Sequence, residues 1–215
     1  MRTRGFTLIE MMIAVALFTI VMVIGIGAVL NANLLHKKTQ SVRAVIDNLG
    51  FVMEDIARNV RLGYDFTCEG VDAALYLPAT GSTPPTLSGN LLTDPADCLV
   101  ASNLYSSVSF TPTNIDPTVT TVRRLAYVIT PVGIFKNDIP DIASGVSGQF
   151  KLLTPPEVII DSAQSGFLVL GSQKADEVQP RVVIRLSGFV TYKNQQTPFV
   201  LQTTISPRYR DDPEI

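Results

Sequence analysis

The chain has few of the residues that catalytic and metal sites use most often. It contains one histidine, two cysteines and no tryptophan among 215 residues, and Asp, Glu, Lys and Arg together make up 17%. The single histidine, His36, adjoins Lys37 and Lys38 at the end of a long apolar segment, where we expect it to provide interfacial polarity. A Ser-His-Asp or Cys-His arrangement would need a histidine in the domain that follows, so we expect no such catalytic site and no enzyme.

Short signatures of metal and phosphate binding are also missing. The sequence has no His-Glu-x-x-His, no Cys-x-x-Cys and no glycine-rich phosphate loop. Two acidic pairs, Asp94 with Asp97 and Asp138 with Asp141, offer oxygen atoms to a hard cation such as Ca²⁺. Neither pair has the ligand density or spacing of a calcium loop. We therefore interpret them as solvated loop residues and predict no metal and no cofactor.

The charge balance gives no sign of a nucleic acid partner. A net charge of −2 and a pI near 5.4 provide no overall attraction to nucleic acid or anionic lipid. One short basic-aromatic group, Arg123 and Arg124 with Tyr127, falls on an expected strand and is a weak signal for single-stranded DNA. We predict that the chain binds no nucleic acid.

What the chain does have is one long apolar run near its beginning. Within residues 11–30 the only polar side chain is that of Thr19. About 20 apolar residues in a helix span the roughly 30 Å hydrocarbon core of a bilayer. Two arginines precede the run and two lysines follow it, so the basic residues alone do not set its orientation.

A small residue and a carboxylate mark the border in front of this run. Behind the basic residues 1–4 the sequence reads Gly-Phe-Thr-Leu-Ile-Glu. Glu10 lies just inside the apolar segment, where an unpartnered carboxylate costs about 3 kcal/mol. Gly5 lies at the border itself, and a peptidase can be recruited to such a border.

Residues 5–10 resemble the processing signal of the type IV pilin superfamily, which includes type IV pilins and type II secretion pseudopilins. The resemblance implies that a prepilin peptidase cuts between Gly5 and Phe6 and that Phe6 is N-methylated as the new N-terminus. It also implies that Glu10 pairs with the Phe6 amine of a neighbouring subunit during assembly. The alternative is an uncleaved signal anchor in which Glu10 is incidental.

Helical periodicity continues beyond the apolar run. From Val42 to Val60, apolar residues recur every three or four positions, and charged residues occupy the other face. Gly63 suits the position after a helix end, so we expect one helix over residues 6–62, about 85 Å long. Two opposite charge pairs on the polar face have i,i+4 spacing: Arg43 with Asp47, and Glu54 with Arg58.

The two cysteines, Cys68 and Cys98, both follow the helix. A lone pair in an exported domain is typical of a disulfide, and it would close a loop of about 30 residues. On chain-entropy grounds such a bond stabilises by about 3–4 kcal/mol. It would bracket residues 78–98, whose prolines and glycines predict an extended loop. Two free buried thiols are the alternative.

Beyond residue 64 the pattern changes from helix to strand. Alternation of apolar and polar residues is clearest in 182–192 and 198–206, which a turn at 193–196 would join as a hairpin. Four further strands are expected at 105–111, 119–130, 157–161 and 166–171. This order predicts an α+β fold, in which the distal half of a long N-terminal helix packs on an antiparallel β-sheet. A pilin-like N-terminus implies the same fold.

We therefore expect four parts: a cleaved leader (1–5), an apolar membrane and assembly helix (6–35), its amphipathic continuation (36–63) and an extracytoplasmic β-rich domain (64–215). The resemblance implies a cytoplasmic N-terminus and a subunit of a pilus or pseudopilus-type filament. Its partners would be other pilin-like subunits, the prepilin peptidase and methyltransferase, and an inner-membrane assembly platform. A large exported part favours a minor subunit. The alternatives are a membrane-anchored binding domain that never polymerises and an anchored hydrolase that uses carboxylates.

Overall fold

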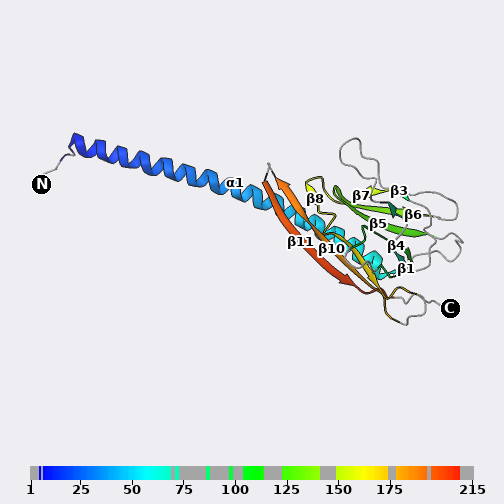
Figure 1. Ribbon diagram of the computed structural model, residues 1–215. Coiled ribbons are helices and arrows are strands. Elements are labelled where there is room, and N and C mark those ends of the chain that lie inside the picture. Colours follow the sequence, from blue (N-terminus) through cyan, green and yellow to red (C-terminus); the bar gives the residue numbers. More distant parts are fainter. Residues whose placement is uncertain are drawn as a thin grey trace. The chain divides into compact units, whose positions relative to one another are not determined.

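One long helix and two larger antiparallel sheets make up the protein, here a computed structural model (Figure 1). The structure describes residues 5, 7–68, 71–72, 86–87, 97–98, 104–113, 123–140, 149–173, 178–192 and 195–208. It divides into two compact units, residues 1–43 and 44–215. The helix α1 (Leu8–Arg61) contributes to both units, and the strands belong to the second.

Helix α1 begins two residues later and ends one residue earlier than the helix expected over residues 6–62. Its distal part buries one stripe of side chains in the second unit: Val45, Leu49, Val52, Ile56, Ala57 and Val60. The two i,i+4 ion pairs expected on the opposite face are not formed. Within the described residues, the ion pairs join Arg123 to Asp138 and Lys136 to Asp55. Exposed helix pairs contribute a few tenths of a kcal/mol, too little to fix long side chains.

Gly63 follows the helix end, as expected, but it does not have the left-handed conformation that is common at that position. Gly63 is the first residue of strand β1 (Gly63–Thr67), and the described glycines with positive φ are Gly133 and Gly171. What Gly63 requires is space, because a Cβ atom there would collide with the ring of Phe110. This close approach lets the sheet begin directly after the helix.

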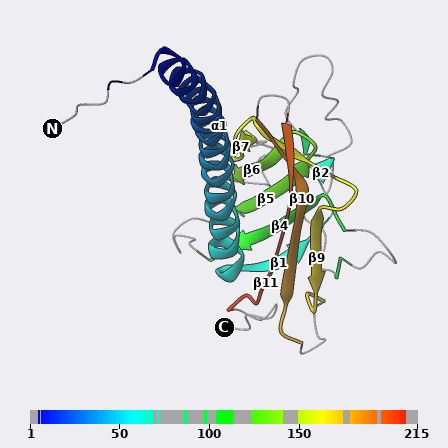
Figure 2. The same ribbon diagram turned by 90° about the vertical axis from the view of Figure 1, so that its left-hand side faces the viewer.

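The first sheet has the strand order β1-β4-β5-β6-β7, with every pair antiparallel (Figure 2). Besides β1 it contains β4 (Ser107–Pro112), β5 (Arg124–Thr130), β6 (Gly133–Ile139) and β7 (Lys151–Leu152). Strands β4 and β5 fall within the expected 105–111 and 119–130, except that β4 runs one residue further and residues 119–122 lie outside the described residues. Strands β1, β6 and β7 were not expected.

The second sheet is built around β10 (Arg181–Tyr192), which pairs with β11 (Gln195–Ile205) along one edge. On its other edge, β9 (Gly166–Leu170) pairs with residues 181–185 of β10 and β8 (Val158–Ile160) with residues 188–190. The α+β class is confirmed, but the strands divide between two larger sheets, where one was expected. Alternation identifies a strand without specifying which strand it pairs with.

Two parts of the chain differ from the expected loops. Tyr192 pairs with Gln195, so β11 begins inside the segment expected as the turn, and only residues 193–194 lie between the strands. A further antiparallel pair joins β2 (Val71–Asp72) to β3 (Thr86–Leu87), which places a short strand within the expected loop 78–98. Residues 78–85 and 88–96 lie outside the described residues.

Polar contacts fix α1 to the first sheet. The buried Tyr127 hydroxyl donates to Asp55 Oδ2 (2.9 Å) and accepts from Asn59 Nδ2 (2.8 Å), and Lys136 Nζ lies 2.9 Å from Asp55 Oδ2. Burial, together with the nearby Asp55 carboxylate, raises the pKa of Tyr127. The Tyr127 ring stacks on that of Phe110 at 6.2 Å. A single strand residue therefore combines apolar packing with hydrogen bonds to the helix.

Cys68 and Cys98 form a disulfide with a Cα–Cα distance of 5.8 Å. Both residues are buried. Cys68 directly follows β1 of the first sheet, and Cys98 N donates to Val169 O of β9 in the second sheet, at 2.9 Å. The bond therefore connects the end of β1 to a residue that is hydrogen-bonded to the second sheet, as well as closing a loop in the sequence.

Removing the disulfide is expected to lower the melting temperature of the full chain in detergent by about 5–15 °C, because the unfolded chain regains the entropy of an open loop. The variant is Cys98→Ser, and circular dichroism in the β-sheet region measures the transition. Wild-type protein treated with a reductant serves as the matched control and should melt with the variant. Readily alkylated thiols in the native wild-type protein would contradict the bond.

Alkaline pH is expected to destabilise the wild type more than a Tyr127→Phe variant. An unfolded tyrosine loses its proton near pH 10. The folded Tyr127 keeps its proton to higher pH, so stability is complete below about pH 10 and falls as the pH rises above it. At pH 7 the variant should be less stable by about 1–2 kcal/mol through its lost hydrogen bonds. Thermal melts between about pH 7 and 11 test this, and equal alkaline slopes would contradict it.

Candidate functional site

The start of α1 is a capping box formed by Thr7 and Glu10. The Thr7 backbone N–H and the Thr7 hydroxyl each donate to Glu10 Oε2 at 3.0 Å, and Glu10 N donates to Thr7 Oγ1 at 3.4 Å. This reciprocal pattern satisfies backbone N–H groups that have no partner inside the helix. Because the carboxylate lies in the first turn, it also interacts favourably with the helix dipole. The Thr-x-x-Glu spacing is a sequence signal for this cap, and sequence analysis missed it.

Gly5 precedes the cap and is exposed. A Cβ atom built at Gly5 would have no other atom within 4 Å. The chain's own fold therefore places no steric demand for glycine at this position, and any such demand comes from outside the chain. Phe6, the residue expected to become the N-terminus, lies outside the described residues.

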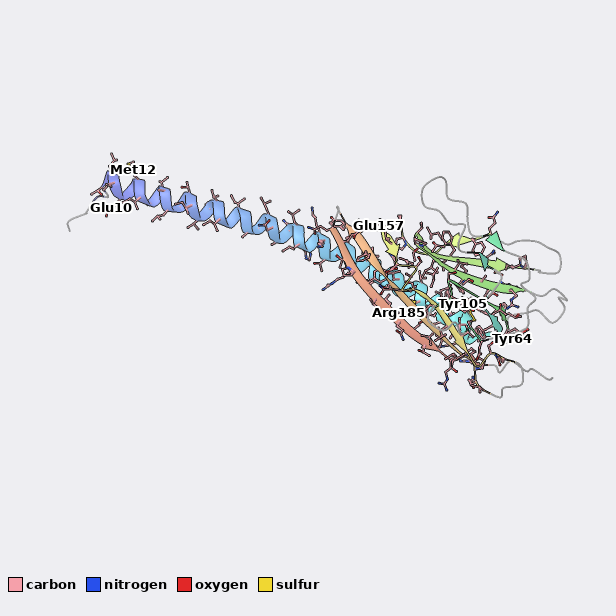
Figure 3. All side chains as sticks on the ribbon, viewed as in Figure 1. Glu10, Met12, Tyr64, Tyr105, Glu157 and Arg185 are labelled. Atoms are coloured by element: carbon pink, nitrogen blue, oxygen red, sulfur yellow. A yellow bond between two sulfur atoms is a disulfide. The ribbon has the colours of Figure 1, made fainter. Side chains whose placement is uncertain are left out.

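The apolar part of α1 is uncovered on every side. From Leu8 to Leu35 all of its side chains are exposed, and Figure 3 shows Glu10 and Met12 near the start of the helix, with side chains projecting along its length. The helix is long and apolar enough to cross a membrane. A helix that is apolar all round needs lipid or other helices as its surroundings.

Thr19, the single polar side chain in the middle of this segment, is satisfied within the helix. Its hydroxyl lies 2.8 Å from Ala16 O and 3.0 Å from Val15 O, and it donates to these backbone carbonyls. A hydroxyl bonded back to the preceding turn leaves no unmet donor in hydrocarbon. The Thr19 hydroxyl therefore does not oppose burial of the middle of this segment in lipid.

His36 lies on α1 and shares a 3.0 Å hydrogen bond with the amide of Gln40, one turn further along. Both residues are exposed. No group of three or more metal-ligating side chains occurs in the part of the chain that the structure describes. The histidine thus lies on the helix and outside the β-rich part, as expected from its sequence position.

The structure describes one residue of each acidic pair, and Asp138 lies in a strand where a loop was expected. Asp138 lies on β6 and forms a two-point ion pair with Arg123, whose hydrogen bonds hold the pKa of the Asp138 carboxyl below its ordinary value. Asp97 accepts a 2.7 Å hydrogen bond from the Ser172 N–H. Asp94 and Asp141 lie outside the described residues. Both described carboxylates have structural partners.

The basic-aromatic group does not form a surface patch. Arg124 is buried, and its guanidinium donates to Asp65 O (2.8 Å) and Thr67 Oγ1 (3.1 Å) of β1. Burial lowers the pKa of Arg124 from its ordinary value. Tyr127 is fully buried. These residues hold neighbouring strands and α1 together, so they are not available to stack on bases.

Residues 1–26 match the family described as the prokaryotic N-terminal methylation motif. No curated protein and no solved structure matches this chain. The matched segment includes Gly5, the Thr7–Glu10 cap and the first half of the uncovered apolar surface. Helix α1 and the motif together fit membrane anchoring. The chain therefore carries a prepilin-type signal, of the kind found in type IV pilins and pseudopilins.

Proposed function

We propose that this protein is a structural subunit of a type IV pilus or pseudopilus-type filament and has no catalytic role. The observation that carries the proposal is the match of the prepilin-type signal to the start of a helix whose apolar surface is uncovered from Leu8 to Leu35. A bilayer covers such a surface before assembly, and a bundle of similar helices covers it afterwards. The same segment can therefore serve as membrane anchor and as assembly element.

Processing is proposed to precede assembly. A prepilin peptidase removes residues 1–5 on the cytoplasmic side, and Phe6 becomes an N-methylated N-terminus. The open space around Gly5 supports this reading, because glycine there is explained by the needs of a peptidase and not by packing. The mature subunit then has its β-rich domain outside the cytoplasm. Its partners are the peptidase, an inner-membrane assembly platform and other pilin-like subunits.

Glu10 is proposed to change partners when the subunit enters the filament. In the single chain its carboxylate accepts hydrogen bonds from the N–H and the hydroxyl of Thr7. Both donors are neutral, so the negative charge of Glu10 is not compensated. An ionised carboxylate surrounded by apolar helices is costly without a positive partner. The ammonium group of Phe6 on a neighbouring subunit supplies that charge, and it exists only after cleavage. This order would couple maturation to polymerisation.

Replacing Gly5 is expected to block maturation. A peptidase pocket that accepts no side chain before the cut rejects valine, so Gly5→Val should retain residues 1–5 when the intact mass is measured. The matched control is Gly50→Val, since Gly50 also has open space around it and lies far from the cut. Normal cleavage of Gly5→Val would remove the main support for the proposal. An uncleaved wild-type protein with an intact Met1 would favour an anchored binding domain.

Two substitutions at Glu10 separate its charge from its capping role. Glutamine accepts the capping hydrogen bonds, whereas alanine does not. If the charge drives assembly, Glu10→Ala and Glu10→Gln should both be cleaved and membrane-inserted, yet depleted several-fold in sheared filaments. The measurement compares filament fractions at matched membrane levels. Normal incorporation of Glu10→Gln would show that capping, and not charge pairing, is what Glu10 provides, and the pairing would be abandoned.

We further propose that this is a minor subunit. The second unit is large for a densely repeated building block, and its chain includes the added β2-β3 pair. The sheared filaments from the Glu10 experiment also report this, because quantitative mass spectrometry gives each subunit's copy number. A minor role predicts far fewer copies than the most abundant subunit has. Equal copy numbers would overturn the minor role without affecting the proposed assembly.

A further inference from the structure

Strand β11 forms a free edge of the second sheet (Figure 1). It pairs with β10 along its whole length and with no other described strand. None of its eleven residues, Gln195–Ile205, is charged. Natural sheets usually protect such an edge with charged side chains, prolines or a covering element, and Pro198 is the one such device within β11. The edge is therefore suited to pairing with a further strand.

The hydrogen bonds of β10 show which backbone groups of β11 face this edge. Thr191 N donates to Glu157 O at 3.0 Å, and Asp161 N donates to Ser187 O at 2.8 Å, so the odd-numbered residues of β10 point toward β8. Its even-numbered residues therefore point toward β11, where they pair with odd-numbered residues. The N–H and C=O groups of the even-numbered β11 residues are left pointing outward. These residues are Gln196, Pro198, Val200, Gln202 and Thr204.

The outward backbone groups of β11 have no partner among the described residues. No hydrogen bond there joins β11 to any segment other than β10. Pro198 offers a C=O without an N–H, whereas Val200, Gln202 and Thr204 each offer both groups. The stretch from Val200 to Thr204 is about 14 Å long, which is enough to pair with a short strand.

The opposite edge of the same sheet is covered by the chain itself. Tyr105 exchanges two backbone hydrogen bonds with Phe167 of β9, at 2.9 and 2.8 Å. On β8, Ile160 N donates to Pro131 O at 3.0 Å. The fold thus supplies backbone partners to the edge formed by β8 and β9 and supplies none to β11. This difference indicates that the partner of β11 comes from outside the chain.

The inner face of the sheet is also left half-covered at β11. Leu186 of β10 is buried, whereas its partner Leu201 and the nearby Phe199 are half-buried. On the outer face, Val200 is 61% exposed. A strand added beside β11 places alternate side chains next to Phe199 and Leu201 on one face and next to Val200 on the other. The surroundings of β11 therefore favour a segment with apolar residues at alternate positions.

From this edge we infer that β11 binds an extended segment of a different pilin-like subunit, which adds a strand to the second sheet. Charge does not select the partner, because Arg185 lies on β10 and the oppositely charged Glu157 directly precedes β8. The unpaired backbone selects it, since another extended backbone matches regularly spaced N–H and C=O groups. The inference rests on the proposed function, in which copies of this minor subunit are too few to adjoin one another.

Amide hydrogen exchange tests the added strand in sheared filaments. In the full-length chain in detergent, β10 protects the odd-numbered amides of β11, and those of Val200, Gln202 and Thr204 exchange rapidly. In filaments we expect these outward amides to slow by about 100-fold or more, as read by mass spectrometry with peptide fragmentation. Phe167 is the internal control and should not change, because its N–H is already bonded to the chain. Equally rapid exchange in filaments would overturn the inference.

Proline variants test whether the outward N–H groups matter. Val200→Pro removes one such group and leaves the hydrogen bonds to β10 in place, so it should melt within a few degrees of the wild type. We expect it to be depleted several-fold in sheared filaments at matched membrane levels. Val200→Thr, the matched control, keeps the N–H and the branched shape and should be incorporated normally. Leu201→Pro should instead lower the melting temperature by several degrees, because the Leu201 N–H faces β10.

Normal incorporation of a folded Val200→Pro chain would overturn the strand addition. If that variant does not fold, Gln202→Pro takes its place, since the Gln202 N–H also points outward and is flanked by strand residues on both sides.

Photo-cross-linking identifies the occupant. A benzophenone amino acid replaces Gln202 in the full-length chain, and irradiated filaments are analysed by peptide mapping. We expect adducts to an extended segment of another pilin-like subunit. Gln164, exposed in the turn after β8, is the matched control position and should give several-fold fewer adducts. Adducts to a second copy of this chain, or to a protein outside the filament, would overturn the inference.

These outcomes separate the inference from the proposed function. Wild-type chain in filaments with rapid exchange at the outward amides would overturn the strand addition and leave the proposed function standing. Wild-type chain absent from filaments would overturn the proposed function, and exchange and cross-linking are then measured on membranes. Slowed exchange there, with adducts to another pilin-like subunit, would support the strand addition by itself, and rapid exchange there would overturn it.

Discussion

The absence of any covering for the first half of α1 is the constraint on which the rest of the molecule depends. An apolar cylinder in water is strongly unfavourable, so the segment from Leu8 to Leu35 needs lipid or other helices around it. The helix start satisfies its own backbone through Thr7 and Glu10, and Thr19 bonds back to its preceding turn. The helix start and the Thr19 hydroxyl thus find their hydrogen-bond partners within the chain, and the apolar surface of the segment is left to be covered.

The distal half of the same helix meets the opposite demand, because it must pack on one side and face water on the other. Its buried stripe contributes apolar packing, which has little dependence on orientation. The hydrogen bonds and the ion pair among Asp55, Asn59, Tyr127 and Lys136 depend strongly on orientation. Apolar packing alone tolerates small rotations of a helix on a sheet. Buried hydrogen bonds do not, since each rotation leaves a donor or acceptor unmet. This network therefore gives α1 a defined position on the first sheet.

Much of this fold was predictable wherever periodicity was strong. The long helix, β10 and β11 follow from repeats near 3.6 and 2, and the Cys68–Cys98 pairing followed from its being the only pair. Strand β6 was missed because Lys136, Asn137 and Asp138 are polar residues that are typical of loops. In the structure, the charge of Lys136 is compensated by Asp55 of α1, and that of Asp138 by Arg123, which precedes β5. The role of Gly63 was misjudged because a clash with Phe110, distant in sequence, is invisible to local pattern.

The disulfide has a mechanical consequence. Within the second unit, Tyr127 and Lys136 attach α1 to the first sheet, so a pull applied along the helix reaches that sheet directly. A hydrogen bond from Arg208 N, three residues beyond β11, to Arg61 O also connects the chain after the second sheet to the end of α1. Weak bonds of this kind open one at a time under sustained tension. The Cys68–Cys98 bond is covalent, so under such a pull it keeps Cys98, which is hydrogen-bonded to β9, beside the end of β1.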